Sequence, residues 1–112
     1  MKDYIIFIRE DVARMAQLSE EEFQTEIQQY GEWVETMSKS GHYVAGDPLE
    51  SEGKYLRKDS IQSDGPFIES KEAISGYVII KAQDMDEAVS LARKCPIFQY
   101  DGALEVRPIM KY

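Results

Sequence analysis

The sequence predicts an α+β fold of the ferredoxin-like kind, in which a β-α-β-β-α-β order carries one inserted hairpin. Three observations support this prediction. Runs of β-branched and aromatic residues are typical of strands, two capped amphipathic stretches are typical of helices, and the two kinds alternate along the chain. At 112 residues and 12.9 kDa, the chain is expected to form one domain over residues 1–112, with two helices covering one face of a four-stranded antiparallel sheet.

The first part of the chain predicts a strand followed by the start of a helix. Residues 4–8 are all β-branched or aromatic, which is typical of a strand that is apolar on both faces. Residues 10–18 are mixed and predict a loop with a short turn at 12–15. Ser19 and Glu22 have the spacing of a capping box, so a long helix is expected to begin after Ser19.

The apolar residues of this long helix recur at steps of three and four, and this stripe predicts its buried face. Glu26 falls off the stripe, and Trp33 lies beside it. Gly41 is expected to end the helix. The predicted buried residues are Phe23, Ile27, Tyr30, Val34 and Met37.

The middle of the chain predicts a second strand and the inserted hairpin. Residues 42–45 favour a short strand that ends in the turn Gly46-Asp47-Pro48. Charged and apolar residues alternate over 54–58 and 60–62, which predicts a small hairpin. The run Ser63-Asp64-Gly65-Pro66 is a further turn signal, after which the chain is expected to return to the sheet.

The last third predicts another strand, helix and strand. Residues 76–82 favour a central strand, and Asp84 with Glu87 three residues later predicts a helix start. Pro96 is expected to end this helix, and residues 104–109 alternate as a final strand. The predicted inner stripe of the helix is Ala88, Leu91, Ala92 and Cys95.

The two strongest predicted strands are apolar on both of their faces. This holds for residues 5–8 and for residues 77–80. Because side chains alternate across a strand, the sheet face away from the helices would expose a large apolar patch in a monomer. A second copy packed sheet to sheet would cover that patch, so we predict a homodimer.

Charge and cysteine content exclude several classes of function. The chain has 21 acidic and 13 basic residues and a net charge of −8, which argues against electrostatic binding to nucleic acid or to an anionic membrane. Cys95 and His42 are single residues of their types, so neither an internal disulfide nor a zinc site of four Cys and His ligands can form within one chain. The apolar run at residues 5–8 is too short for a signal sequence or a membrane span, so we expect a cytoplasmic protein.

No nucleotide-binding or hydrolase motif occurs in the sequence, so no cofactor is expected. Carboxylates at Asp47, Asp64 and Glu69 could in principle hold a metal ion, but three loop carboxylates are common by chance and no metal site is predicted. The densest polar segment is 64–72, Asp-Gly-Pro-Phe-Ile-Glu-Ser-Lys-Glu. It allows two interpretations: a structural turn anchored by Phe67, or a rigid turn that presents charged groups to a pocket with Phe67 as its wall.

This segment closely resembles the DGPF signature of the YCII-related family. The resemblance rests on Asp64-Gly-Pro-Phe67, on Glu69-Ser-Lys-Glu72 and on Gly76-Tyr77. Supporting matches run over residues 2–110, and they include the opening Met-Lys-x-Tyr-Ile-Ile, Leu18-Ser19-x-Glu21-Glu22, Tyr30, Gly41, Asp84-Met-Asp-Glu-Ala88, Cys95-Pro96 and Glu105-Val-Arg-Pro-Ile109.

The resemblance implies a dimeric α+β barrel, in agreement with the argument from the two-faced strands. The family is largely uncharacterised, and its members occur as small stand-alone proteins and as partners or neighbours of extracytoplasmic-function sigma factors. A related branch includes a dehydrochlorinase with a catalytic His-Asp pair. That histidine would fall near Tyr30, whereas the only histidine here is His42 at the far end of the helix, so the pair is not present.

Two function hypotheses follow from these observations. The first is a small-molecule cleft at the dimer interface, with or without cofactor-free acid–base or elimination chemistry. The second is a regulatory or protein-interaction module of the sigma-factor-associated type. The predicted ligand-binding residues are Asp64, Gly65, Pro66, Phe67, Glu69, Lys71 and Arg107.

In an enzyme, Asp64 or else His42 would be the catalytic base, and Lys71 or Arg107 would stabilise negative charge. Structural interpretations of two of these residues stay open beside the functional ones. His42 would be a half-exposed residue that opens a strand, and Arg107 would pair with Asp64 or Glu69. Tyr30 and Cys95 are expected to be core residues.

Overall fold

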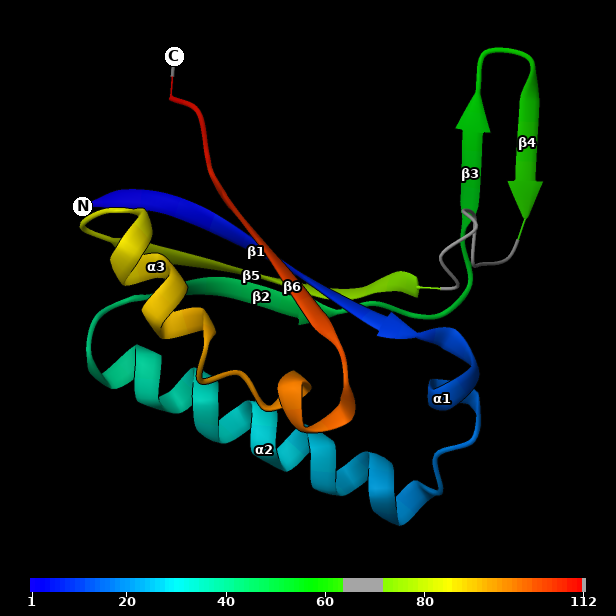
Figure 1. Cartoon of the computed structure of the whole chain (residues 1–112), viewed down its shortest axis with the longest axis horizontal. Helices are drawn as coiled ribbons and strands as arrows, with labels where there is room; N and C mark the ends of the chain where they lie inside the picture. The colour runs from blue at the N-terminus through cyan, green and yellow to red at the C-terminus, as the bar shows by residue number, and fades with distance from the viewer. Residues whose placement is uncertain (64–71, 112) are drawn as a thin grey trace.

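The computed structural model describes residues 1–63 and 72–111 and confirms the α+β fold with an antiparallel sheet (Figure 1). The main sheet has the order β2-β5-β1-β6, which is the ferredoxin-like order. Its strands are β1 (Lys2–Asp11), β2 (Tyr43–Pro48), β5 (Glu72–Ala82) and β6 (Ala103–Pro108). The helices are α1 (Val12–Ala16), α2 (Glu20–Lys39), α3 (Met85–Ala92) and the 3₁₀ turn η1 (Pro96–Tyr100).

The core lies between the sheet and the two longer helices, α2 and α3, which cover the same face (Figure 1). Ile6 of β1 and Ile80 of β5 are fully buried at its centre. Trp33 of α2 donates an indole N–H hydrogen bond of 3.0 Å to the carbonyl oxygen of Leu91. This bond joins the two helices and satisfies the one polar group of a buried ring.

The predicted start and end of α2 are confirmed in detail. The Ser19 hydroxyl accepts a 3.1 Å hydrogen bond from the amide of Glu22, and the Glu22 carboxylate accepts one of 3.0 Å from the amide of Ser19. These two bonds satisfy amides that the first helical turn leaves without partners. At the other end, Gly41 follows the helix with φ of +80°, a conformation that suits glycine.

The predicted buried face of α2 is wrong in its first half. Phe23 and Ile27 are 51% and 48% exposed, whereas Glu26 and Trp33 are buried. The buried face therefore includes Tyr30 and Met37 as predicted, but Glu26 and Trp33 take the places of Ile27 and Val34. The physical reason is that this half of α2 borders a cleft rather than a packed core, as described below.

Two local predictions also differ from the structure. The expected loop at residues 10–18 contains the short helix α1, whose first turn is capped by the carboxylate of Asp11 at 2.9 Å from the amide of Ala13. The expected turn at Gly46-Asp47-Pro48 is part of β2, which runs on to Pro48. Gly46 is required there for packing, since an added Cβ would lie 2.7 Å from the carbonyl oxygen of Tyr77.

The sheet face opposite the helices carries a central group of apolar side chains, which we call the open face. It comprises Ile5 and Phe7 of β1 and Tyr77 and Ile79 of β5, all half-buried. Ile5 is opposite Ile79 and Phe7 is opposite Tyr77 in the antiparallel register. The predicted apolar second face is therefore present in the chain.

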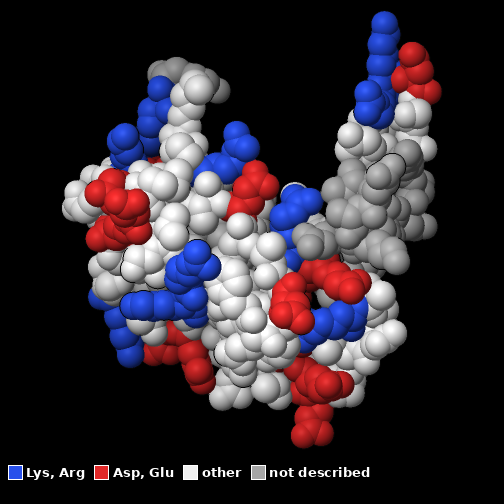
Figure 2. Space-filling view, viewed as in Figure 1, with Lys and Arg blue, Asp and Glu red and all other residues white. Residues whose placement is uncertain are grey.

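The inserted hairpin is confirmed as β3 (Lys54–Arg57) and β4 (Ser60–Ser63), and it projects away from the main sheet (Figure 1). Figure 2 shows acidic and basic side chains interspersed on the face in view, with both signs at the far end of the hairpin. Among the described residues, no helix is long and apolar enough to cross a membrane.

Replacing the cap of α2 tests how much of the fold depends on this local signal. We expect Ser19→Ala to lower the free energy of unfolding by about 1 kcal/mol, since the capping hydroxyl is lost. Urea unfolding followed by circular dichroism measures the change. Ser38→Ala, on the exposed side of the same helix, is the matched control. Equal effects of the two substitutions would show that the cap contributes nothing.

Candidate functional site

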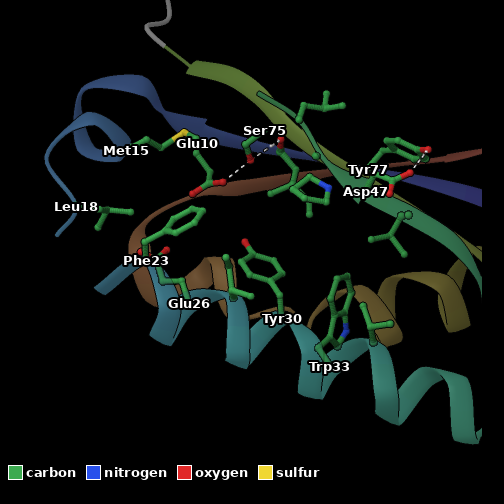
Figure 3. Close-up of a pocket in the computed structure, with 18 of the residues that line it drawn as sticks. Glu10, Met15, Leu18, Phe23, Glu26, Tyr30, Trp33, Asp47, Ser75 and Tyr77 are labelled. Atoms are coloured by element: carbon green, nitrogen blue, oxygen red, sulfur yellow. Dashed lines mark hydrogen bonds between the residues drawn. The ribbon is translucent and has the colours of Figure 1, made fainter. Parts of the chain in front are cut away.

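A cleft of about 350 Å³ lies between the first half of α2 and the helix-facing side of the sheet (Figure 3). Its walls are mainly apolar. The side chains that form these walls come from β1, from α1 and the following loop, from α2 and from β5; they are Ile8, Met15, Leu18, Phe23, Ile27, Trp33, Val34 and Val78. This size and lining are typical of a small-molecule site.

The cleft exists because α2 does not pack down on the sheet along its whole length. Met37, near the end of the helix, is buried, whereas Phe23 and Ile27 near its start are half exposed and line the cleft. A Cβ at Gly76 of β5 would contact β2 at 3.1 Å, so the sheet floor is tightly packed beside the opening. The apolar residues at the start of α2 thus border open space instead of neighbouring side chains.

A group of charged side chains closes one end of the cleft, and we call it the polar end. Glu10, Arg14 and Glu26 form it, with Ser75 beside Glu10. The Arg14 guanidinium lies 3.0 Å from Glu26 Oε2 and 3.5 Å from Glu10 Oε1. The two carboxylate side chains are only 12% and 9% exposed, so these charges interact in a largely dry environment.

Further contacts hold the polar end in place. The Ser75 hydroxyl donates a hydrogen bond to Glu10 Oε2, which joins β5 to β1 (Figure 3). The guanidinium of Arg14 lies over the ring of Tyr100 at 4.2 Å, and the Tyr100 hydroxyl donates a 2.5 Å hydrogen bond to Gln29. The polar end is therefore fixed by elements from the start, the middle and the end of the chain.

Tyr30 points from α2 toward the polar end, with its hydroxyl directed at the side of the cleft that holds Glu10 (Figure 3). The hydroxyl oxygen is buried and makes no hydrogen bond to any residue that the structure describes. Burial raises the pKa of the Tyr30 hydroxyl well above its usual range, and the neighbouring Cys95 thiol and the charge of Glu10 raise it further. The phenol therefore stays protonated at physiological pH and is available as a donor.

A second polar pair, Tyr77 and Asp47, joins β5 to β2 on the open face of the sheet, away from the polar end of the cleft. The Tyr77 hydroxyl donates a 3.0 Å hydrogen bond to Asp47 Oδ2, and this bond raises the pKa of Tyr77. Both side chains are close to solvent, in contrast to the polar end. Within residues 1–63 and 72–111, no three Asp, Glu, His or Cys side chains come together in a way that could hold a metal ion.

The predicted site residues fall into two groups. Asp64, Gly65, Pro66, Phe67, Glu69 and Lys71 lie outside the described residues. His42 and Arg107 are described, and neither lines the cleft. The His42 Nδ1 atom lies 2.7 Å from the carbonyl oxygen of Lys81, and the Arg107 guanidinium lies 3.3 Å from Glu105 on an exposed part of β6.

Four residues of the polar end were not among the predicted site residues: Glu10, Arg14, Glu26 and Ser75. The signal that could have found them is a charged residue inside an apolar pattern. Glu26 lies on the helix face that also carries Tyr30 and Trp33, where a solvated acid is not expected unless a cation meets it. The expectation that Tyr30 is a core residue is only half correct, since its ring packs on the core while its hydroxyl faces the cleft.

Comparison with known proteins finds one family. The family model described as YCII-related domain matches residues 4–112, which is almost the whole chain. No curated protein matches the sequence.

The environment of Cys95 gives a prediction for thiol reactivity. Burial raises the pKa of this thiol from 9.0 to about 11, so its thiolate fraction at pH 8 falls about 100-fold. We expect the native protein to react with Ellman's reagent at least about 100-fold more slowly than the guanidinium-unfolded chain. Because the unfolded thiol ionises first, the free energy of unfolding should also fall as the pH rises from 9 toward 11. Fast native reaction would contradict this description of the core.

Proposed function

This chain belongs to the YCII-related family, and we propose that it binds a small, mainly apolar molecule in the cleft between α2 and the sheet. The observation that carries the proposal is the lining of the cleft. Phe23 and Ile27 are half exposed, and both line a concave cleft that has polar groups at one end. Apolar surface gains about 25 cal/mol per Å² when it leaves water, so a ligand that covers these side chains is stabilised by that contact.

Acid–base chemistry without a cofactor would use the polar end of this cleft. Glu10 is a carboxylate that lines the cleft, and Ser75 and Arg14 fix its orientation. A carboxylate held in this way can accept a proton from a bound molecule. Tyr30 beside it can donate a hydrogen bond to an oxygen on which negative charge develops.

The segment 64–71 remains a proposed contributor to the same site. Strand β5 follows it directly and carries Ser75 into the polar end of the cleft. On this proposal, Asp64, Glu69 and Lys71 add polar groups to a cleft whose described part is mainly apolar.

The homodimer is part of the proposal. The open face presents Ile5, Phe7, Tyr77 and Ile79 side by side at the centre of the sheet. Charged side chains surround these apolar ones, including Asp3 and Lys81, which are opposite each other in the register. A second copy packed on this face removes the apolar group from water and leaves the charges at the rim, as in stable interfaces.

The hairpin favours the second function, a protein-interaction module. Leu56 and Ile61 are directly opposite each other in the β3–β4 register, and each is 66% exposed. A cross-strand apolar pair on a projecting hairpin is a contact suited to another protein.

A pair of matched substitutions tests the small-molecule cleft. The probe is N-phenyl-1-naphthylamine, a neutral apolar dye whose fluorescence rises in apolar surroundings. We expect Ile27→Trp to weaken dye binding at least about tenfold, since the larger ring occupies the cleft. Ile61→Trp, on the hairpin, should bind the dye like the wild type. Equal binding by both variants, or no binding by the wild type, would contradict the proposed cleft.

Native mass spectrometry of a lysine variant tests the dimer. We expect the wild type to be a dimer and Ile79→Lys to be a monomer, because an ammonium group at the centre of the open face cannot be buried without a partner. Val89→Lys on the exposed side of α3 is the control and should remain a dimer. A monomeric wild type would overturn the sheet-to-sheet interface.

A further inference from the structure

The chemistry of the polar end restricts what the proposed cleft can bind. Glu10 and Glu26 carry two negative charges, and Arg14 supplies one positive charge between them. No lysine or arginine is among the described residues that line the cleft. The carboxylate of Asp47, another of these residues, is hydrogen-bonded to Tyr77 on the open face. The polar end therefore carries one excess negative charge. A carboxylate, sulfonate or phosphate group bound beside it would be repelled, because like charges interact strongly where little water screens them.

Tyr30 adds a requirement for a hydrogen-bond acceptor. Its hydroxyl is buried, remains protonated, and has no hydrogen-bond partner among the described residues. Its polar neighbour in the core is the thiol of Cys95, and sulfur is a weak acceptor. A buried donor that is left unsatisfied is costly, and a ligand oxygen in the cleft would satisfy it.

Glu10 adds the complementary requirement for a donor. Its carboxylate lines the cleft and has about four acceptor positions, of which the Ser75 hydroxyl occupies one. Arg14 Nη1 lies 3.5 Å from Glu10 Oε1, which is an ion pair without a hydrogen bond. The remaining positions are available to a donor within the cleft. Figure 3 shows Glu10 and Tyr30 approaching the same space from the sheet and from α2.

We infer that the cleft recognises a neutral aromatic or alicyclic molecule through a single hydroxyl group, which accepts a hydrogen bond from Tyr30 and donates one to Glu10. A hydroxyl is a donor and an acceptor on one atom, so it satisfies both protein groups at one position. A carbonyl would accept from Tyr30 but would give the free acceptor positions of Glu10 no donor, and a carboxylate would meet the excess negative charge.

The walls of the cleft fit the ring of such a ligand. Tyr30 and Trp33 meet edge to face, with ring centroids 6.4 Å apart and an interplanar angle of 68°. Phe23, which comes from the same helix, also lines the cleft (Figure 3). Aromatic side chains at different orientations provide both faces and edges for a flat ring. This inference rests on the proposed small-molecule cleft and adds the chemical class of its ligand.

Three probes with the same bicyclic ring test the inference: 2-naphthol, naphthalene and 2-naphthoate. Their binding is measured by displacement of N-phenyl-1-naphthylamine at pH 7. We expect 2-naphthol to bind the wild type at least about tenfold more tightly than naphthalene, because only 2-naphthol has a hydroxyl that can bond to Tyr30 and Glu10. We expect 2-naphthoate to bind more weakly than 2-naphthol, because the polar end carries excess negative charge.

Two conservative variants test whether Tyr30 and Glu10 cause the preference for 2-naphthol over naphthalene. Tyr30→Phe and Glu10→Gln should each reduce the preference for 2-naphthol over naphthalene to less than about threefold while naphthalene binding stays the same. Tyr55→Phe on the hairpin and Glu32→Gln on the exposed side of α2 are the matched controls and should keep the full preference. Thermal unfolding of each variant establishes that it is folded.

The outcomes separate the inference from the proposed function. Equal binding of 2-naphthol and naphthalene, both weakened by Ile27→Trp, would overturn the hydroxyl inference and leave the cleft standing. Tighter binding of 2-naphthoate, or an unchanged preference in Tyr30→Phe, would likewise overturn the inference. If the wild type binds neither the dye nor any of the three probes, both the inference and the proposed function are wrong.

Discussion

The contact of Arg14 with two carboxylates is the constraint around which the site is organised. Glu10 ends β1, Arg14 lies in α1, and Glu26 lies in α2, so one guanidinium joins three consecutive elements. The ring of Tyr100 beneath it adds η1. Removing Arg14 would leave the largely buried carboxylates of Glu10 and Glu26 without a compensating charge, which is strongly unfavourable. This interaction therefore ties the first half of α2 to the end of β1 at the polar end of the cleft.

The fold could be predicted from the sequence because its signals are local. The capping box at Ser19 and Glu22, and the β-branched runs in β1 and β5, depend on residues a few positions apart. The polar end could not be predicted in the same way. Glu10, Glu26 and Ser75 are far apart in sequence and meet only once the sheet has formed. Glu26 shares a helix face with Tyr30 and Trp33, but no local pattern distinguishes Glu10 or Ser75 from solvated polar side chains.

The errors of prediction on α2 have the same origin. A periodic stripe predicts which residues face inward, but it does not say whether the inward side is packed. Phe23 and Ile27 do face the sheet side of the helix, yet α2 leaves a cleft there, and both stay half exposed. Trp33 is buried in their place, and its indole N–H donates a hydrogen bond to the carbonyl oxygen of Leu91. The two residues that were wrongly predicted to be buried, Phe23 and Ile27, are therefore residues of the cleft itself.

The two apolar surfaces of this chain differ in shape, and the difference decides what each can bind. The open face is part of a sheet, and its apolar residues Ile5, Phe7, Tyr77 and Ile79 form a surface that only another extended surface can cover. The cleft is concave and has Glu10 and Tyr30 at one end, so it suits a molecule of limited size with a polar group at one position. Because β1 contributes Ile5 and Phe7 to one surface and Ile8 and Glu10 to the other, a single strand connects them. A substitution in β1 that shifts the strand at the open face would therefore also shift the residues that line the cleft.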